Sequence, residues 1–192
     1  ALSMLADQMF VQPIHGKGVR VIWLKGETDM LGALEEVESF GEFAKRNNAV
    51  ASTDVKSFEH LICTEQLSRR LGFKVGEELI RVVRVRSLNG NARQVDHGYF
   101  LESIAKGLTP EIAAKSIYDY LEHKRGVKVM ASRRTVSVEL ANDEDCSYLD
   151  LGKYNCVAVM ESQSYTSDGI LFEVTHARTH PEIFHYRVNS KR

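Results

Sequence analysis

Hydrophobic and polar residues alternate along much of this chain, and alternation with a period of two predicts β-strands. The strand-like stretches run from Val50 to Ile62, Glu78 to Leu88, Arg93 to Leu101, Val127 to Leu140, Val157 to Tyr165, Ile170 to Thr179 and Glu182 to Val188. Asn89-Gly90 and Ser167-Asp168-Gly169 separate two neighbouring pairs of them, and such residues are typical of hairpin turns. Consecutive hairpins favour a mostly antiparallel sheet.

Short helices are predicted between the strands from their capping residues. They follow Ser39, Thr64, Thr109 and Asn142. The first has the strongest signal, because Glu42 stands three residues after Ser39 and completes a capping box. The third opens with Pro110, kinks near Ser116 and ends near Gly126. Helices interspersed among hairpins indicate an α+β fold, a mostly antiparallel sheet flanked by short helices.

The first 25 residues follow another pattern. Residues 1–9 read as the end of a helix, and the β-like runs 10–14 and 19–23 flank His15-Gly16-Lys17-Gly18. The two glycines can take a positive φ, so this tetrapeptide is predicted as a hairpin turn. Because an isolated hairpin is barely stable, we expect residues 1–25 to be the end of a domain that starts upstream. Residues 26–38, rich in acids and glycine, are predicted as a linker to a domain over 39–192.

Composition excludes several classes of protein. The chain has 192 residues, 43% hydrophobic and 27% charged, which is ordinary for a globular domain. Lys and Arg number 25 against 26 Asp and Glu, so this is not a generally basic nucleic-acid coat. No apolar run approaches a membrane span and no secretory signal is evident. Three cysteines without a C-x-x-C spacing argue against a disulfide scaffold and favour the cytoplasm.

Motifs for catalysis or metal binding are scarce. We find no nucleophile elbow, no H-E-x-x-H and no phosphate-binding loop that ends in Gly-Lys-Ser/Thr. His176 and His180 are four residues apart, but on a strand this spacing does not form the pair seen on a helix, so no metal site is expected. The turn at residues 15–18, with Arg20 nearby, is locally basic and suits phosphate contacts with DNA, although an ordinary basic turn has the same composition.

Arg84-Val85-Arg86 is the most informative short motif. Residues two apart on a strand share a face, so both guanidinium groups can bind one phosphate or carboxylate. The same spacing also fits solvated arginines on an exposed face. A helix N-terminus beside them would favour an anion, and Ser39-Phe40-Gly41 and Ser116-Ile117-Tyr118 are two such starts, each with a serine hydroxyl.

Together these pieces resemble the GntR superfamily of bacterial transcription regulators, specifically its HutC subfamily. Those proteins join an N-terminal winged helix-turn-helix to a C-terminal effector domain called UTRA. The resemblance rests on Gly16-Lys17-Gly18 as the wing, Ser39-Phe40 as the effector-domain start, Leu67 to Gly72, Arg84-Val85-Arg86, Ser116-Ile117-Tyr118, Asp168-Gly169 and Phe172-Glu173. It implies a UTRA fold, similar to that of chorismate lyase, behind a remnant of a winged helix-turn-helix.

Within the subfamily the chain is most similar to repressors of trehalose operons. The resemblance implies a homodimer that binds operator DNA and responds to a sugar phosphate such as trehalose 6-phosphate; other members respond to amino-sugar phosphates. The implied phosphate-binding residues are Ser39, Phe40, Arg84, Arg86 and Ser116, and the implied sugar contacts are Asp96, Tyr118, Tyr165 and Glu173. The implied DNA contacts of the wing are His15, Gly16, Lys17 and Gly18.

Asp96 depends on the hairpin turn before it. A strict two-residue turn puts Asp96 on the face opposite Arg84, and only a longer or bulged turn brings it into the same pocket.

Two other functions stay open at this stage. A chorismate lyase-like enzyme could hold a carboxylated ring between Arg84, Arg86 and Glu173, although such an enzyme has no use for a wing and a linker. A plain protein-interaction module would bind no small anion at all. No cofactor or membrane partner is expected for any of the three, and a regulator that senses a sugar phosphate accounts for most of the motifs.

Overall fold

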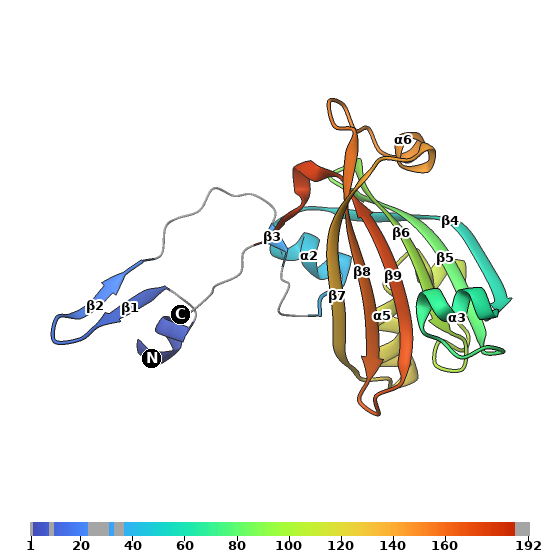
Figure 1. Cartoon of the computed structure of the whole chain (residues 1–192), viewed down its shortest axis with the longest axis horizontal. Coiled ribbons are helices and arrows are strands. Elements are labelled where there is room, and N and C mark those ends of the chain that lie inside the picture. Colours follow the sequence, from blue (N-terminus) through green and yellow to red (C-terminus); the bar gives the residue numbers. More distant parts are fainter. Residues whose placement is uncertain (1, 8–9, 23–30, 33–36, 187–192) are drawn as a thin grey trace.

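The computed structural model of the chain describes residues 2–7, 10–22, 31–32 and 37–186 (Figure 1). Predictions that fall on residues 1, 8–9, 23–30, 33–36 and 187–192, including most of the linker, lie outside the described residues. Among the described residues, no helix has the length and apolar character needed to cross a membrane.

One six-stranded antiparallel sheet forms the body of the protein, in the order β4-β5-β6-β9-β8-β7. Its strands are β4 (Ala51–Ile62), β5 (Glu78–Leu88), β6 (Asn91–Leu101), β7 (Val129–Leu140), β8 (Cys156–Thr166) and β9 (Leu171–Thr179). The predicted α+β class with a mostly antiparallel sheet is confirmed. The two predicted hairpin turns connect β5 to β6 and β8 to β9, with Gly90 and Gly169 at positive φ.

The helices are short and lie between the strands. They are α2 (Phe40–Arg46), α3 (Glu65–Leu71), α4 (Pro110–Ala113), α5 (Ile117–Asp119), a π-helical turn η1 (Tyr120–Lys124) and α6 (Asp143–Tyr148). The predicted caps are present: Ser39 forms a capping box with Glu42, and Thr64 and Asn142 cap α3 and α6. The single kinked helix predicted after Thr109 is wrong, because Ser116 is extended and caps a new helix.

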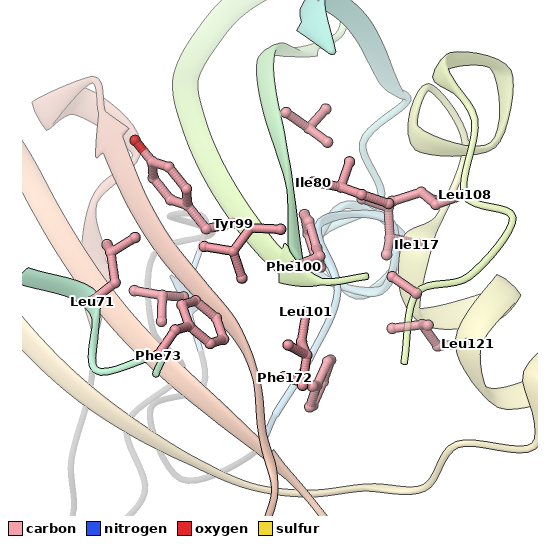
Figure 2. Packing of buried hydrophobic residues seen from close by; sticks show 14 of the residues in the cluster. Leu71, Phe73, Ile80, Tyr99, Phe100, Leu101, Leu108, Ile117, Leu121 and Phe172 are labelled. Atoms are coloured by element: carbon pink, nitrogen blue, oxygen red, sulfur yellow. The ribbon is translucent and has the colours of Figure 1, made fainter. Parts of the chain in front are cut away.

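Helices cover both faces of the sheet. Directly opposed residues share a face, so we define the front face by Arg84, Asp96 and Ala177 and the back face by Val83 and His97. On the back face, α3 and the segment around α6 pack against the strands. The larger core cluster gathers around Phe100 and Phe172, with Leu71 and Phe73 on one side and Leu108, Ile117 and Leu121 on the other (Figure 2).

The N-terminal residues form the predicted helix end and hairpin: α1 (Leu2–Asp7), β1 (Val11–Ile14) and β2 (Gly18–Val21). Within the predicted linker lies a short strand, β3 (Leu31–Gly32), which pairs in parallel with β10 (His185–Tyr186). The last strand begins at His185 and not at the predicted Glu182, because Pro181 starts a 3-10 turn, η2 (Pro181–Ile183), before it; residues 187 and 188 of the predicted strand lie outside the described residues.

Candidate functional site

The floor of the candidate site is a cluster of the buried Arg84 and Asp96 with the partly buried Arg86 on the front face. Both arginines come from β5, and Asp96 of β6 stands directly opposite Arg84. Asp96 Oδ2 accepts hydrogen bonds from Arg84 Nη2 at 2.6 Å and from Arg86 Nε and Nη2 at 3.1 and 2.8 Å. Arg84 and Asp96 are only 3% and 2% exposed, so this ion-pair cluster is shielded from bulk water.

A β-bulge puts Asp96 in this cluster. A strict two-residue turn in the β5–β6 hairpin would have turned Asp96 to the back face. The register instead shifts between Arg86 and Ser87, which leaves Arg93 as an extra residue on β6. From that point onward β6 presents Asp96 to the front face, so the bulged alternative considered from the sequence is the one that the structure adopts.

The cluster has an excess of positive charge. Burial alone would raise the pKa of Asp96, but the charges of Arg84 and Arg86 and their hydrogen bonds outweigh burial and lower that pKa to about 2. Burial, and then the neighbouring Arg86, lower the pKa of Arg84. Among the described residues, the buried Arg84 Nε has no hydrogen-bond partner. An anionic ligand could supply both the missing acceptor and the missing negative charge.

Glu173 and Tyr118 form a second buried polar group further along the same face. The Tyr118 hydroxyl donates to Glu173 Oε2 at 2.5 Å and lies 3.2 Å from Ser164 Oγ. Burial is the main cause that raises the pKa of Glu173, and burial followed by the charge of Glu173 raises that of Tyr118. Both groups have oxygens suited to sugar hydroxyls, which donate and accept hydrogen bonds.

Ser39, Phe40 and Ser116 form the rim of the site. Ser39 Oγ and Ser116 Oγ each accept a backbone N–H as the N-caps of α2 and α5. Each hydroxyl hydrogen can therefore still be donated to a ligand. The Arg86 guanidinium carbon lies 5.1 Å from the centroid of the Phe40 ring, within the range of a cation–π contact.

These residues line one cavity of about 170 Å³. A single water needs roughly 10–15 Å³ by this kind of measure, so the cavity has room for a molecule larger than an inorganic ion. Of the predicted effector-binding residues, the structure brings eight together here: Ser39, Phe40, Arg84, Arg86, Asp96, Ser116, Tyr118 and Glu173.

Tyr165 is the predicted residue that the structure keeps out of the cavity. Its neighbour Ser164 points to the front face, so strand alternation turns Tyr165 to the back. There the Tyr165 hydroxyl lies 3.5 Å from Gln163 Oε1, and Gln163 in turn donates to the Leu71 carbonyl of α3. The pairing of Ser164 with Glu173 is what leaves Tyr165 on the other face.

Several lining residues were missed by the sequence analysis. The main ones are Gln94, Lys115, Ser132, Arg134, Ser162, Thr175, Thr179, Phe184 and Tyr186. Many of them could have been found from the two-residue period of a strand. Every second residue of β8 (160, 162 and 164) and of β9 (173, 175, 177 and 179) lines the cavity. The lining contains four basic side chains and three acidic ones, so the cavity is weakly positive. The basic residues are Arg84, Arg86, Lys115 and Arg134, and the acidic residues are Glu38, Asp96 and Glu173.

The histidines and the hairpin lie apart from this chemistry. His176 pairs with Glu161, whereas the buried His180 contacts the Asp150 carbonyl through Nε2. Among the described residues, no group of three His, Cys, Asp or Glu side chains could hold a metal ion. In the β1–β2 hairpin, the turn residues His15, Gly16, Lys17 and Gly18 are all exposed, with both glycines at positive φ.

Comparison with known proteins identifies the class. The model of the UTRA domain matches residues 46–185, so the chain belongs to the UTRA domain family. The chain is similar to the HTH-type transcriptional regulator TreR of Bacillus subtilis, 28% identical over 97% of this chain and 77% of TreR. It is also similar to the HTH-type transcriptional repressor NagR of the same organism, 23% identical over 93% of this chain and 71% of NagR.

Solved structures agree on the fold. The effector-binding domain of the B. subtilis trehalose repressor TreR superposes with a TM-score of 0.65 at 27% identity, covering 73% of this chain and 98% of that domain. The B. subtilis "possible transcriptional regulator YydK" gives a TM-score of 0.76 at 22% identity, over 99% of this chain and 80% of YydK. The chain is therefore a transcriptional regulator of the GntR/UTRA type, not a chorismate lyase-like enzyme.

Proposed function

We propose that this chain senses a sugar phosphate, with trehalose 6-phosphate as the first candidate, and represses a sugar-utilisation operon in the cytoplasm. The observation that carries the proposal is the pair formed by the buried Arg84 and the partly buried Arg86, which share one aspartate; Arg84 Nε has no hydrogen-bond partner within the described part of the chain. A phosphate monoester presents several acceptor oxygens and up to two negative charges, so it suits this cluster better than a neutral sugar does.

The two ends of the cavity fit the two parts of such a ligand. Arg84 and Arg86, with the Ser39 and Ser116 hydroxyls, bind the phosphate. Tyr118 and Glu173 bind sugar hydroxyls at the other end. The similarity to the trehalose repressor favours trehalose 6-phosphate, and the similarity to NagR makes an amino-sugar phosphate the alternative.

The cavity also borders both segments that adjoin the predicted linker. Ser39 and Phe40 follow it directly. Phe184, just before β10, and Tyr186, within β10, also line the cavity, and β10 pairs with β3 of the linker. We propose that ligand binding in the homodimer changes the spacing of the two DNA-binding heads, with the exposed Lys17 hairpin contacting operator DNA. The coupling equals the difference in ligand affinity between the two states, commonly about 1–3 kcal/mol.

A thermal-shift series tests the sensor. Trehalose 6-phosphate, glucosamine 6-phosphate and plain trehalose are compared on the wild type, Arg84→Met and Arg81→Met. Arg81 is the matched control, because it lies on the same strand but on the back face, paired with Glu59. A ligand at 100 times its Kd should stabilise the wild type and Arg81→Met by about 2.7 kcal/mol, and Arg84→Met should lose this response. Equal stabilisation by trehalose and its phosphate would contradict the proposal.

A further inference from the structure

The cavity that holds the arginine cluster is small for a disaccharide phosphate. Its volume is about 170 Å³. A protein cavity of about 150 Å³ accommodates one benzene molecule, and pockets that enclose ligands of drug size measure about 300–1,000 Å³. The cavity therefore has room for about one hexose ring with its phosphate, and a second hexose ring needs further space.

A groove of about 320 Å³ adjoins this cavity, between α2 on one side and α5 with η1 on the other. Ser39, Gly41, Ser116 and Tyr118 line both the cavity and the groove. The first two lie at the start of α2 and the last two at the start of α5, so the two spaces meet where these helices begin. Tyr118 is at the sugar end of the proposed site, so a ligand held there can continue past its ring into the groove.

Unused polar groups line the groove on both sides. Lys45 lies on α2 and Glu122 on η1, and both are exposed. Within the described part of the chain, neither side chain forms a hydrogen bond or an ion pair. An ammonium group donates hydrogen bonds and a carboxylate accepts them, so the two match sugar hydroxyls, which do both. Other charged groups of the lining have partners already: Glu42 closes the capping box of α2, and Asp119 pairs with His123.

Apolar side chains also line the groove. Val37 and Val129 are half-buried there, and a pyranose ring has apolar C–H faces that can pack against them. The side that carries Glu122 is the π-helical turn η1, and turns of this kind are frequent at functional sites. A few polar groups set among apolar ones are typical of small-molecule sites.

We propose that the second hexose ring of a disaccharide phosphate binds in this groove, with its hydroxyls between Lys45 and Glu122. This inference rests on the proposed sensor and names its ligand class, because a disaccharide phosphate is then preferred to a hexose phosphate. The phosphate and the first ring stay in the cavity beside Arg84. Loss of the groove contacts should therefore weaken binding of a disaccharide phosphate relative to that of a hexose phosphate.

Isothermal titration calorimetry with trehalose 6-phosphate and glucose 6-phosphate tests the groove. The measured quantity is the ratio of their two dissociation constants, because the long-range effect of removing one charge acts on both phosphates and cancels in the ratio. The wild type should bind trehalose 6-phosphate about tenfold more tightly, since the second ring adds hydrogen bonds to two charged groups. Lys45→Ala and Glu122→Ala should each reduce this preference about 3–10-fold.

Glu65→Ala and Arg69→Ala are the matched controls. These two residues form an exposed ion pair on α3, a helix of the same length as α2 on the back face of the sheet. Each control removes one exposed charge from a short helix, as the groove variants do. Both controls should keep the wild-type ratio of dissociation constants.

The possible outcomes separate this inference from the sensor itself. Equal or weaker binding of trehalose 6-phosphate by the wild type would overturn the groove site and leave a sensor of hexose phosphates. An unchanged ratio in either groove variant, or a ratio reduced as much in the α3 controls, would also overturn the groove site alone. If neither sugar phosphate binds the wild type, the proposed function fails and the groove site fails with it.

Discussion

Asp96→Asn is the most direct perturbation of the buried charge cluster. The substitution keeps the side chain's shape but removes the one negative charge that Arg84 and Arg86 share. Because Arg84 is 3% exposed, its charge would then be buried beside a second cation without its hydrogen-bonded carboxylate. Breaking a buried ion pair in this way costs about 3–5 kcal/mol, so we expect the free energy of unfolding at pH 7 to fall by about that amount.

The destabilisation caused by Asp96→Asn should also depend on pH, and the pKa of Asp96 determines the direction of that dependence. That pKa is lowered from 3.8 to about 2 on folding, which corresponds to about 2 kcal/mol of stability. A carboxyl group whose pKa is lower in the folded state stabilises the fold fully at any pH above its pKa in the unfolded state. This stabilisation is lost as the pH falls toward its pKa in the folded state. About 1 kcal/mol of it should be gone by pH 3. Asparagine does not titrate, so wild type and variant should converge as the pH falls.

Urea unfolding followed by far-UV circular dichroism between pH 7 and pH 3 measures this convergence. Asp54→Asn is the matched control, because Asp54 pairs with Lys56 on the exposed edge strand. Exposed ion pairs contribute roughly 0–1 kcal/mol, so this control should stay within that range at every pH. A wild-type advantage over Asp96→Asn that is constant from pH 7 to pH 3 would refute the assignment of the lowered pKa to Asp96.

Three further substitutions probe the surroundings of the site. Gly98→Ala should cost about 1–3 kcal/mol in urea unfolding, because the new Cβ would lie 2.7 Å from the ring of the fully buried Phe100. Gly41→Ala should instead be neutral or stabilising by up to about 1 kcal/mol, since its Cβ meets no atom closer than 3.9 Å and it lies in a helix. Tyr118→Phe should cost about 1–3 kcal/mol in the same assay, because buried Glu173 loses its shortest hydrogen bond, and an unchanged midpoint would contradict that contact.

Most of the fold was predictable because local signals determine it. The alternation of hydrophobic and polar residues predicted the strands of the sheet. The capping residues Ser39, Thr64 and Asn142 start helices, because their side chains accept backbone N–H groups. The order of the strands was not predicted, because hairpins fix only sequential neighbours. The helix predicted after Thr109 failed for a local reason: Ser116 is compatible with a kink and with a new cap, and periodicity alone does not distinguish them.

The site was predictable where residues sit two apart on one strand, and less so where it depends on pairing between strands. Arg84 and Arg86 share a face by the geometry of β5 alone. The position of Asp96 in the site depends on the bulge at Arg93, and no residue in the sequence marks that bulge. Arg134 comes from a strand far along the chain, and only the folded sheet brings it into the same cavity as the arginines of β5. Tyr165 was placed by resemblance, and the face of β8 that lines the cavity is fixed only by the pairing of β8 with β9.

The single extra residue at Arg93 has a consequence for exchanging parts between related regulators. If β6 paired with β5 from the turn onward without this bulge, Val95 would stand opposite Arg84 in place of Asp96. A carboxylate would then be traded for an aliphatic side chain without mutation of either position. Chimeras and loop grafts in this hairpin must therefore transplant the turn and the strand after it as one cassette.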